Sequence, residues 1–425
     1  MQFKLLFGLL AGVALIGNAA QAAKIELIVD YPYPDMFNTV HEGIAKRFTE
    51  KFPDYTVKFR APTPEYEAAA QQALRHAVTR QLADVSYQGL NRQRVFVDRN
   101  IAVDLTPFIQ AEKDWDKSGY SPALMSLGQV NGKQVGIGFS LSTPIVYYNM
   151  DLLERAGVKA DALPKTWDDI LAAADKSRAA NAGTNGLHYD WEITGNWLWQ
   201  AMVFSKGGSM LDASEAKVAF DDQTGRESIE QMGRMVEHGT MQNLKYKDAA
   251  QLFVTGKLAV LSSSTSRLST IEKQIGGKFK MVTGFFPTYG DNARVPAGGN
   301  VAMMFAKDPA RQKAAWEYIK FATGPEGATI MTKGTGYFPA NTLPIDDPAK
   351  LKGYYDANPN QYTAVRQLPW LTGWYAFPGE NGLKITDVIN DHLQTVFDKS
   401  TKPDAALDAM TRDVQKLLKL SLIHI

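Results

Sequence analysis

Six histidines and many carboxylates are the side chains of this sequence that could do acid–base or metal chemistry. The histidines never occur at metal-ligand spacing, and the sequence has neither a phosphate-binding loop nor a nucleophile elbow. Asp190 and Glu192 flank Trp191, and two such acids could cleave a glycosidic bond if they faced each other across a sugar. A polar loop beside an aromatic ring is the simpler interpretation. We therefore expect no catalytic residue, no metal site and no cofactor.

Short runs of hydroxyl side chains follow or precede apolar segments at two places. Residues 262–266 (SSSTS) follow the apolar run 258–261 and open a helix expected over 267–274. Backbone N–H groups at such a helix start would face a ligand oxygen or an anion. Residues 140–144 (SLSTP) lead into a strand expected at 145–149. Both segments would suit a polar cleft that binds a hydroxylated ligand.

Glycines and aromatic residues would complete such a cleft. The A-G-G-N segment at 297–300 lets the backbone approach a ligand closely, because glycine has no Cβ. Residues 334–339 (GTGYFP) form a rigid turn with an aromatic at its tip. Trp191, Trp197 and Trp199 crowd one region and could supply an aromatic platform.

Alternating strands and helices must position these segments. A β-rich run at 24–29, an amphipathic stretch at 41–51 and an alternating run at 55–59 are followed by a helix at 65–81 and a strand at 83–87. This order is typical of an α/β lobe with a parallel sheet. Further helices are expected after the N-caps Thr166 and Asp308 and at 385–397 and 403–418. Without a flexible linker, the chain should form two lobes and cross between them more than once.

Composition narrows the function classes. The chain has 425 residues and a net charge of +1, from 46 basic and 45 acidic side chains. This balance gives no electrostatic case for binding nucleic acid or an anionic membrane surface. The complete lack of cysteine excludes disulfides, thiol catalysis and thiolate metal sites.

Both ends of the sequence carry special segments. Lys4, the apolar run 5–16 and the small residues before Ala22 and Ala23 indicate a signal peptide over 1–23 that is cleaved after export. The expected location is the periplasm of a Gram-negative cell. Residues 420–425 (LSLIHI) resemble the translated end of a sequencing adapter, and we expect them to be an artefact.

The order of the motifs resembles that of family 1 extracellular solute-binding proteins, the soluble receptors of ABC importers. The resemblance runs from the signal peptide to about Leu418, and the set in this order is specific although no single piece is. It is carried by STPIVYYN at 142–149, PKTWDD at 164–169, GKLAV at 256–260, AGGN at 297–300 and TGYFPA at 335–340.

The resemblance implies a type II periplasmic binding protein fold, with two α/β lobes that close on a ligand between them. We expect crossings near Ser142 and near Phe286. Lobe 1 would comprise residues 24–142 and 286–325, and lobe 2 residues 143–285 and 326–419. We expect such a receptor to be a monomer and to dock on permease subunits in the inner membrane without doing chemistry.

Within the family the chain is most similar to the sn-glycerol-3-phosphate-binding branch. This likeness places the ligand contacts at Tyr66, Ser142, Ser264, Gly299 and Tyr337, with Trp191 or Trp197 stacking on the ligand. The branch has an arginine near the ligand phosphate, where this sequence has Asp387. A carboxylate would repel phosphate, so Lys384 or Arg294 would have to substitute. The expected ligand is glycerol 3-phosphate, a glycerophosphodiester or a sugar-like solute.

Two other classes of function remain open at this point. A secreted carbohydrate-active enzyme would need two acids facing each other across the cleft, and it would turn its ligand over. A signalling receptor would pass its liganded lobes to a sensor. An importer receptor would bind its ligand and release it unchanged.

Overall fold

The computed structural model describes residues 24–237 and 239–422, with side chains up to residue 419. The predicted signal peptide and residues 423–425 of the adapter-like tail lie outside the described residues, as do the side chains of residues 420–422. No helix within the described ranges is long and apolar enough to cross a bilayer.

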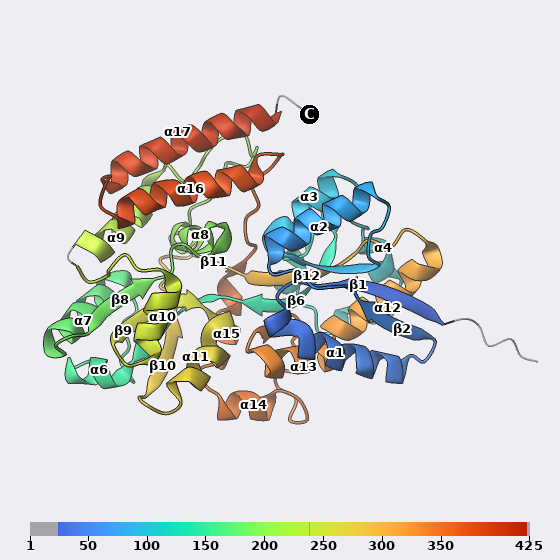
Figure 1. The fold of residues 1–425 in the computed structure, drawn as a ribbon, viewed down its shortest axis with the longest axis horizontal. Helices are drawn as coiled ribbons and strands as arrows, with labels where there is room; N and C mark the ends of the chain where they lie inside the picture. Colours follow the sequence, from blue (N-terminus) through green and yellow to red (C-terminus); the bar gives the residue numbers. More distant parts are fainter. Residues whose placement is uncertain (1–23, 238, 423–425) are drawn as a thin grey trace, which may run out of the picture.

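A six-stranded sheet forms the first lobe, drawn mostly in blue in Figure 1. In order across the sheet its strands are β13 (Phe338–Pro339), β6 (Gly136–Ser142), β12 (Gly298–Met304), β3 (Val85–Gly89), β1 (Ile25–Asp30) and β2 (Tyr55–Phe59). β1 is parallel to β2 and β3, as the strand–helix–strand pattern predicts, whereas β12 runs antiparallel to both of its neighbours. The early part of the prediction is therefore confirmed, and the antiparallel return strand adds to it.

Helices cover this sheet where their apolar faces require. α1 (Pro34–Lys51) buries Phe37, Ile44 and Phe48, and it begins earlier than the predicted residue 41. Tyr33 takes a left-handed conformation just before Pro34, whose fixed φ suits the first helical position. α2 (Tyr66–Val78) and α12 (Pro309–Thr323) form as expected, and Asp308 Oδ1 caps α12 by accepting from the Arg311 N–H at 3.0 Å.

A four-stranded sheet forms the second lobe, green to yellow in Figure 1. Its strands, in order, are β10 (Met281–Phe285), β7 (Pro144–Asn149), β9 (Leu258–Ser264) and β8 (Asn185–Tyr189). Around it lie α6 (Met150–Arg155), α7 (Trp167–Ala180), α10 (Tyr246–Val254) and α11 (Leu268–Ile275). Thr166 caps α7 as predicted, accepting from the Asp169 N–H at 3.1 Å.

Two long C-terminal helices pack on the second lobe. α16 (Gly382–Phe397) and α17 (Pro403–Leu422) contact each other and α9 (Gln223–Glu237), and they lie above it in red in Figure 1. α16 also contacts the single turn at Thr194–Asn196 that precedes α8 (Trp197–Phe204). Both C-terminal helices were predicted, at 385–397 and 403–418.

The chain passes between the two sheets at more than one place. β6 of the first sheet continues into β7 of the second through Thr143, and β10 returns to β12 through residues 286–297. The segment after 325 differs from the predicted lobe boundary. α13 (Pro325–Thr335) packs on α1, and β13 pairs with β6, so this segment lies with the first sheet up to Pro339. Met331 and Tyr337 join that lobe's core, which explains the difference.

Shorter elements connect these parts. They are α3 (Gln93–Asp98), α4 (Thr106–Ala111), α5 (Pro122–Ser126), α14 (Lys352–Ala357), α15 (Tyr362–Arg366), β4 (Gln129–Val130), β5 (Lys133–Gln134), β11 (Val295–Pro296), β14 (Leu371–Thr372) and the single turns Leu90–Arg92, Trp115–Lys117, Thr265–Arg267 and Leu368–Trp370.

Candidate functional site

The two sheets bring six of the eight predicted ligand contacts around one small cavity of about 100 Å³ between the lobes. These six residues are Tyr66, Ser142, Trp197, Ser264, Gly299 and Tyr337. We call this cavity the inner pocket. Its remaining lining residues are Tyr33, Met36, Ile193, Thr194, Ser266, Arg267, Gly298 and Trp374.

Two phenols from the first lobe form one wall of the inner pocket. Tyr66 is the first residue of α2, and its hydroxyl accepts from Asn300 Nδ2 at 3.4 Å. Tyr337 follows α13, and both rings are almost fully buried. Burial raises the pKa of Tyr66 and of Tyr337 above that of a free phenol, so both hydroxyls stay protonated at neutral pH. Each can therefore donate a hydrogen bond to a ligand oxygen.

Two glycines at the start of β12 form the second part of this wall, and they allow the β12 backbone to pack closely against β6 and Trp197. Gly299 has a φ of +110°, and a Cβ there would lie 1.9 Å from the carbonyl oxygen of Ser140. A Cβ on Gly298 would lie 2.7 Å from Ser142 Oγ and 2.9 Å from the Trp197 ring. Only glycine fits at these two places, because β12 packs closely on β6 and on Trp197 there. The predicted approach of this backbone to a ligand stays a prediction.

Hydroxyl groups from the second lobe face these phenols. Ser264 ends β9, and its Oγ accepts from the Ser266 N–H at 3.1 Å and lies 2.9 Å from Ser266 Oγ. The predicted strand–hydroxyl–helix segment is thus confirmed, with a single turn at Thr265–Arg267 before α11.

Arg267 is the one charged side chain among the lining residues of the inner pocket. Its guanidinium carbon lies 4.8 Å from the centre of the Tyr246 ring. Its Nε–H is buried and has no hydrogen-bond partner. Arg267 was predicted only as the start of a helix, although it directly follows the serine run, and its place in the lining was not predicted.

Of the three tryptophans, Trp197 alone reaches the inner pocket. It is 2% exposed, and its Nε1–H has no partner. Trp374, which was not predicted, lines the same pocket with its ring centre 6.0 Å from that of Trp197. Trp191 instead stacks on Phe397 of α16 at 4.8 Å, and Trp199 packs edge-on against Phe220. The predicted role of Trp191 is therefore wrong, because its ring belongs to the core beneath the C-terminal helices.

The charged residues proposed from the sequence do not line the inner pocket. Asp387 and Lys384 are exposed on α16. Arg294 donates to the Gly208 carbonyl at 2.7 Å and covers the Phe204 ring. The assignment of Asp387 to the ligand site is thus wrong, and the phosphate repulsion expected from it does not arise there.

The two acids considered for a glycosidase are also engaged elsewhere. Asp190 is buried, its Oδ2 accepts from Ser263 Oγ at 2.6 Å, and burial raises its pKa to about 6. Glu192 pairs with Lys245 at 2.6 Å. Within the described residues, no cluster of three histidines or acids that could hold a metal ion occurs.

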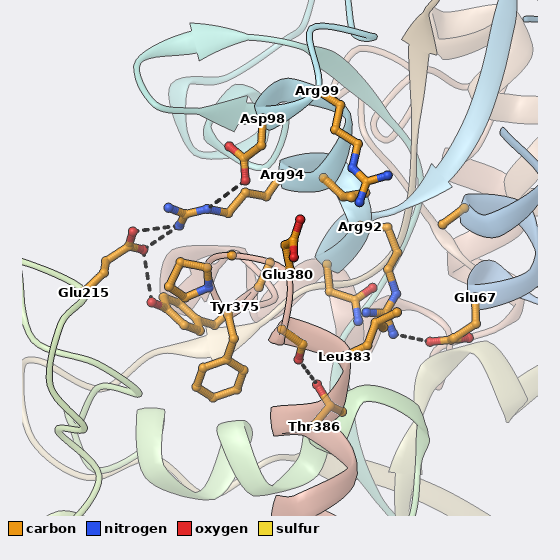
Figure 2. Close-up of a pocket in the computed structure, with 18 of the residues that line it drawn as sticks. Glu67, Arg92, Arg94, Asp98, Arg99, Glu215, Tyr375, Glu380, Leu383 and Thr386 are labelled. Carbon is orange, nitrogen blue, oxygen red and sulfur yellow. Dashed lines mark hydrogen bonds and ion pairs between the residues drawn. The ribbon is translucent and has the colours of Figure 1, made fainter. Parts of the chain in front are cut away.

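A larger cavity of about 650 Å³ lies beside the inner pocket and shares no lining residue with it. We call it the outer cavity (Figure 2). Its walls come from α2 and α3 of the first lobe and from residues 214–215 and 375–386. Glu67 lines the outer cavity, and its Oε1 accepts at 3.1 Å from the hydroxyl of Thr194, which lines the inner pocket. This hydrogen bond joins a residue that lines the outer cavity to one that lines the inner pocket.

Comparison with known proteins places this arrangement in a family. The model of the bacterial extracellular solute-binding protein family matches residues 43–360. The chain belongs to this family. The sn-glycerol-3-phosphate-binding periplasmic protein UgpB of Escherichia coli (strain K12) is 24% identical to it over 431 residues, which cover 96% of this chain and 95% of that protein.

Solved structures share the fold of this solute-binding protein. UgpB from Mycobacterium tuberculosis in complex with glycerophosphocholine has a TM-score of 0.80 at 21% identity, covering 92% of this chain and 98% of that one. The ABC substrate-binding protein Lmo0181 from Listeria monocytogenes in complex with cycloalternan has a TM-score of 0.77 at 20% identity, covering 93% and 99%. At these identities the likeness shows the two-lobe fold. The predicted family and fold are confirmed, and the relatives are binding proteins, in agreement with the predicted function.

Proposed function

We propose that this solute-binding protein is the periplasmic receptor of an ABC importer. It captures a small hydroxylated solute, such as glycerol 3-phosphate, a glycerophosphodiester or a sugar-like molecule, and delivers it to permease subunits in the inner membrane. The observation that carries this proposal is the meeting of six predicted contact residues, from both lobes, around one pocket. Its relatives support the proposal, since their names and titles give glycerol 3-phosphate, glycerophosphocholine and cycloalternan as ligands.

The geometry suits capture by closure of the lobes. Tyr66 and Tyr337 donate from the first lobe, and Ser264 and Ser266 offer hydroxyls from the second. A solute that contacts both sets binds the closed form more strongly than the open form, and this difference drives closure. The ring of Trp197 can lie against the apolar face of a sugar or glycerol while its free Nε1–H donates.

The outer cavity offers room for the rest of a longer solute. The inner pocket of about 100 Å³ holds only a small group, whereas ligand pockets for larger molecules are typically ~300 Å³ or more. A glycerophosphodiester or oligosaccharide would have to separate Glu67 from Thr194 to reach from one space to the other. We therefore expect short solutes to bind without disturbing this contact and long solutes to break it.

A binding panel on the mature protein, residues 24–419, tests the proposal. It compares glycerol 3-phosphate, glycerophosphocholine, glycerol, maltose and cyclic maltosyl-maltose by thermal shift and calorimetry. A ligand at 100 times its Kd should stabilise the folded protein by about 2.7 kcal/mol. Thin-layer or mass analysis after prolonged incubation should recover the bound ligand unchanged.

Two outcomes contradict the proposal. Turnover of a bound sugar would favour the carbohydrate-active enzyme. Failure of every member of the panel to shift the melting temperature would remove the solute-receptor assignment for these ligand classes. Size-exclusion chromatography with light scattering would test the expected monomer in the same preparation.

A further inference from the structure

The lining of the inner pocket carries charge of one sign only, which is positive. Among its lining residues, Arg267 is the only cation, and no aspartate or glutamate is present. The other polar groups there are hydroxyls, from Tyr33, Tyr66, Ser142, Thr194, Ser264, Ser266 and Tyr337. Hydroxyls can donate to an anion as readily as they bind a sugar, so the guanidinium decides the charge preference of the pocket.

Arg267 has no internal counter-charge at contact distance. Within the described residues it makes no ion pair at 4.0 Å or less and no hydrogen bond through its buried Nε–H. The Tyr246 face at 4.8 Å gives it some compensation through a cation–π contact. A largely buried cation without an anionic partner lowers stability, and this penalty is relieved when an anion binds.

The nearby carboxylates are committed to other partners. Asp190 accepts from Ser263, and Glu192 pairs with Lys245. Glu272 accepts from the side-chain amides of Asn360 and Gln361. None of the three lines the inner pocket or pairs with Arg267 at contact distance, and Asp190 attracts the guanidinium only from a longer distance. The guanidinium is therefore available to an oxygen of a ligand in the pocket.

We propose that Arg267 is the anion-binding residue of the cleft, and that the solute carries a phosphate or carboxylate group on a hydroxylated body. This inference rests on the proposed function and narrows its ligand class. A guanidinium presents a planar fork of donors that matches two oxygens of a phosphate or carboxylate. Ser264 and Ser266 lie on the same turn, so their hydroxyls can reach the remaining oxygens.

The other side of the pocket suits the uncharged part of such a solute. Trp197 and Trp374 lie next to each other there, and Gly298 and Gly299 leave space beside them. The anionic group thus binds at the second-lobe turn, while the hydroxylated body lies against the two indole rings and the phenols. Closure of the lobes then encloses the charge with the guanidinium.

Matched ligand pairs test this inference by calorimetry at constant ionic strength. Glycerol 3-phosphate and glycerate are each compared with glycerol, and glycerophosphocholine, a zwitterion whose negative charge lies on a phosphodiester, is measured beside them. We expect at least one anionic member to bind and its neutral counterpart to bind at least roughly 30-fold more weakly. Glycerol 3-phosphate and glycerophosphocholine distinguish a phosphate monoester from a diester, and glycerate tests a carboxylate.

Variants assign the effect to the residue. Arg267→Gln should weaken anion binding by roughly 10- to 150-fold, the range for a hydrogen bond to a charged group. It should change the melting temperature of the ligand-free protein little, because the guanidinium makes no ion pair at contact distance that the variant would lose. Arg267→Lys should restore part of the affinity. Arg294→Gln is the matched control, because Arg294 lies outside the pocket, and it should not change the preference for anions.

The outcomes separate the inference from the proposed function. Wild-type protein that binds neutral ligands as tightly as anionic ones would overturn the role of Arg267 and leave the receptor function standing. Binding of an anion that survives Arg267→Gln unchanged would also overturn it. Failure of both anionic and neutral ligands to bind would contradict the proposed function itself.

Discussion

The guanidinium of Arg94, on α3 of the first lobe, lies 2.7 Å from the carboxylate of Glu215, in the loop before α9. The hydroxyl of Tyr375 donates to the same carboxylate at 3.0 Å, and the three side chains point toward one another beside the outer cavity (Figure 2). Glu215 holds a left-handed φ of 56°, which a residue with a Cβ adopts at a cost. The contact between the lobes persists despite this strain.

Loss of this contact should favour the open form. Glu215→Gln is expected to raise the apparent Kd for any cleft ligand roughly two- to fivefold, since exposed ion pairs contribute about 0.5–1 kcal/mol. Small-angle scattering of the ligand-free variant should show a larger radius of gyration. Glu50→Gln is the control, because its ion pair with Arg47 lies within α1. Equal affinities for the two variants would contradict the prediction.

Gly299→Ala should unfold or strongly destabilise the protein. The new Cβ would lie 1.9 Å from the Ser140 carbonyl oxygen at a φ of +110°, so β12 and β6 would have to separate. Gly353→Ala is the matched control, because a Cβ there meets no atom within 4 Å. Urea titration should show a large loss for the first variant and little change for the second. A stable Gly299→Ala protein would contradict the prediction, because it would show that β12 and β6 can separate at little cost in stability.

Asp84→Asn should destabilise the first lobe. The buried Asp84 carboxylate accepts from the Ile28 N–H at 2.7 Å and from Arg311 Nε at 2.7 Å, so it joins β1 to α12. Removing one partner of a buried ion pair typically costs about 3–5 kcal/mol, and the partly exposed Arg311 places this case at or below the lower end. The midpoint of urea unfolding measures the loss. Lys58→Gln, which removes an exposed pair with Glu26 at 3.8 Å, should change the midpoint little.

The buried His41 should make stability depend on pH. Its ring stacks on Phe139 at 5.2 Å without a hydrogen bond, and burial lowers its pKa to about 3. Between pH 6.5 and 3 the unfolded chain takes up a proton that the folded chain does not, so the free energy of unfolding falls as pH falls, by up to about 1.4 kcal/mol per pH unit. His41→Phe should flatten unfolding curves recorded from pH 7 to 4. His188, whose pKa is lowered to about 4, leaves a residual slope. Parallel curves for wild type and variant would contradict the assignment.

Tyr337→Phe and Ser264→Ala should weaken ligand binding without unfolding the protein. Each removes one hydroxyl from the inner pocket, which corresponds to roughly a two- to tenfold loss in affinity for a neutral hydrogen bond. Tyr337→Ala is less suitable, because the ring packs against Phe37 at 5.8 Å. Calorimetry and circular dichroism on the same samples give the answer. Loss of folding in both variants would contradict the site assignment.

The likeness to the family predicted Ser142, Ser264 and Gly299 as ligand contacts, and in the structure each lies at an end of its strand. Ser142 and Ser264 are the last residues of β6 and β9, and Gly299 is the second residue of β12. Trp191 looked equivalent to Trp197, but its position depends on Phe397, far along the chain. No local pattern distinguishes a tryptophan of the core from one of a cleft.

The missed residues have a similar cause. Arg267 became part of the site because Tyr246 covers it from another helix, and Trp374 because its loop lies against α8's first residue, Trp197. Asp387 was matched to a ligand arginine of the branch by its position in the sequence, and in the structure its side chain is exposed on α16. Contacts between distant segments decided each of these positions.

The strand order of the two sheets also sets the order in which a newly made chain can complete them. β12 lies between β3 and β6, so the first sheet lacks a central strand until residue 304 has been made. All four strands of the second sheet lie within residues 144–285. The second sheet, whose lobe begins later in the chain, can therefore be completed first. Until β12 has been made, β3 and β6 each keep an unpaired edge.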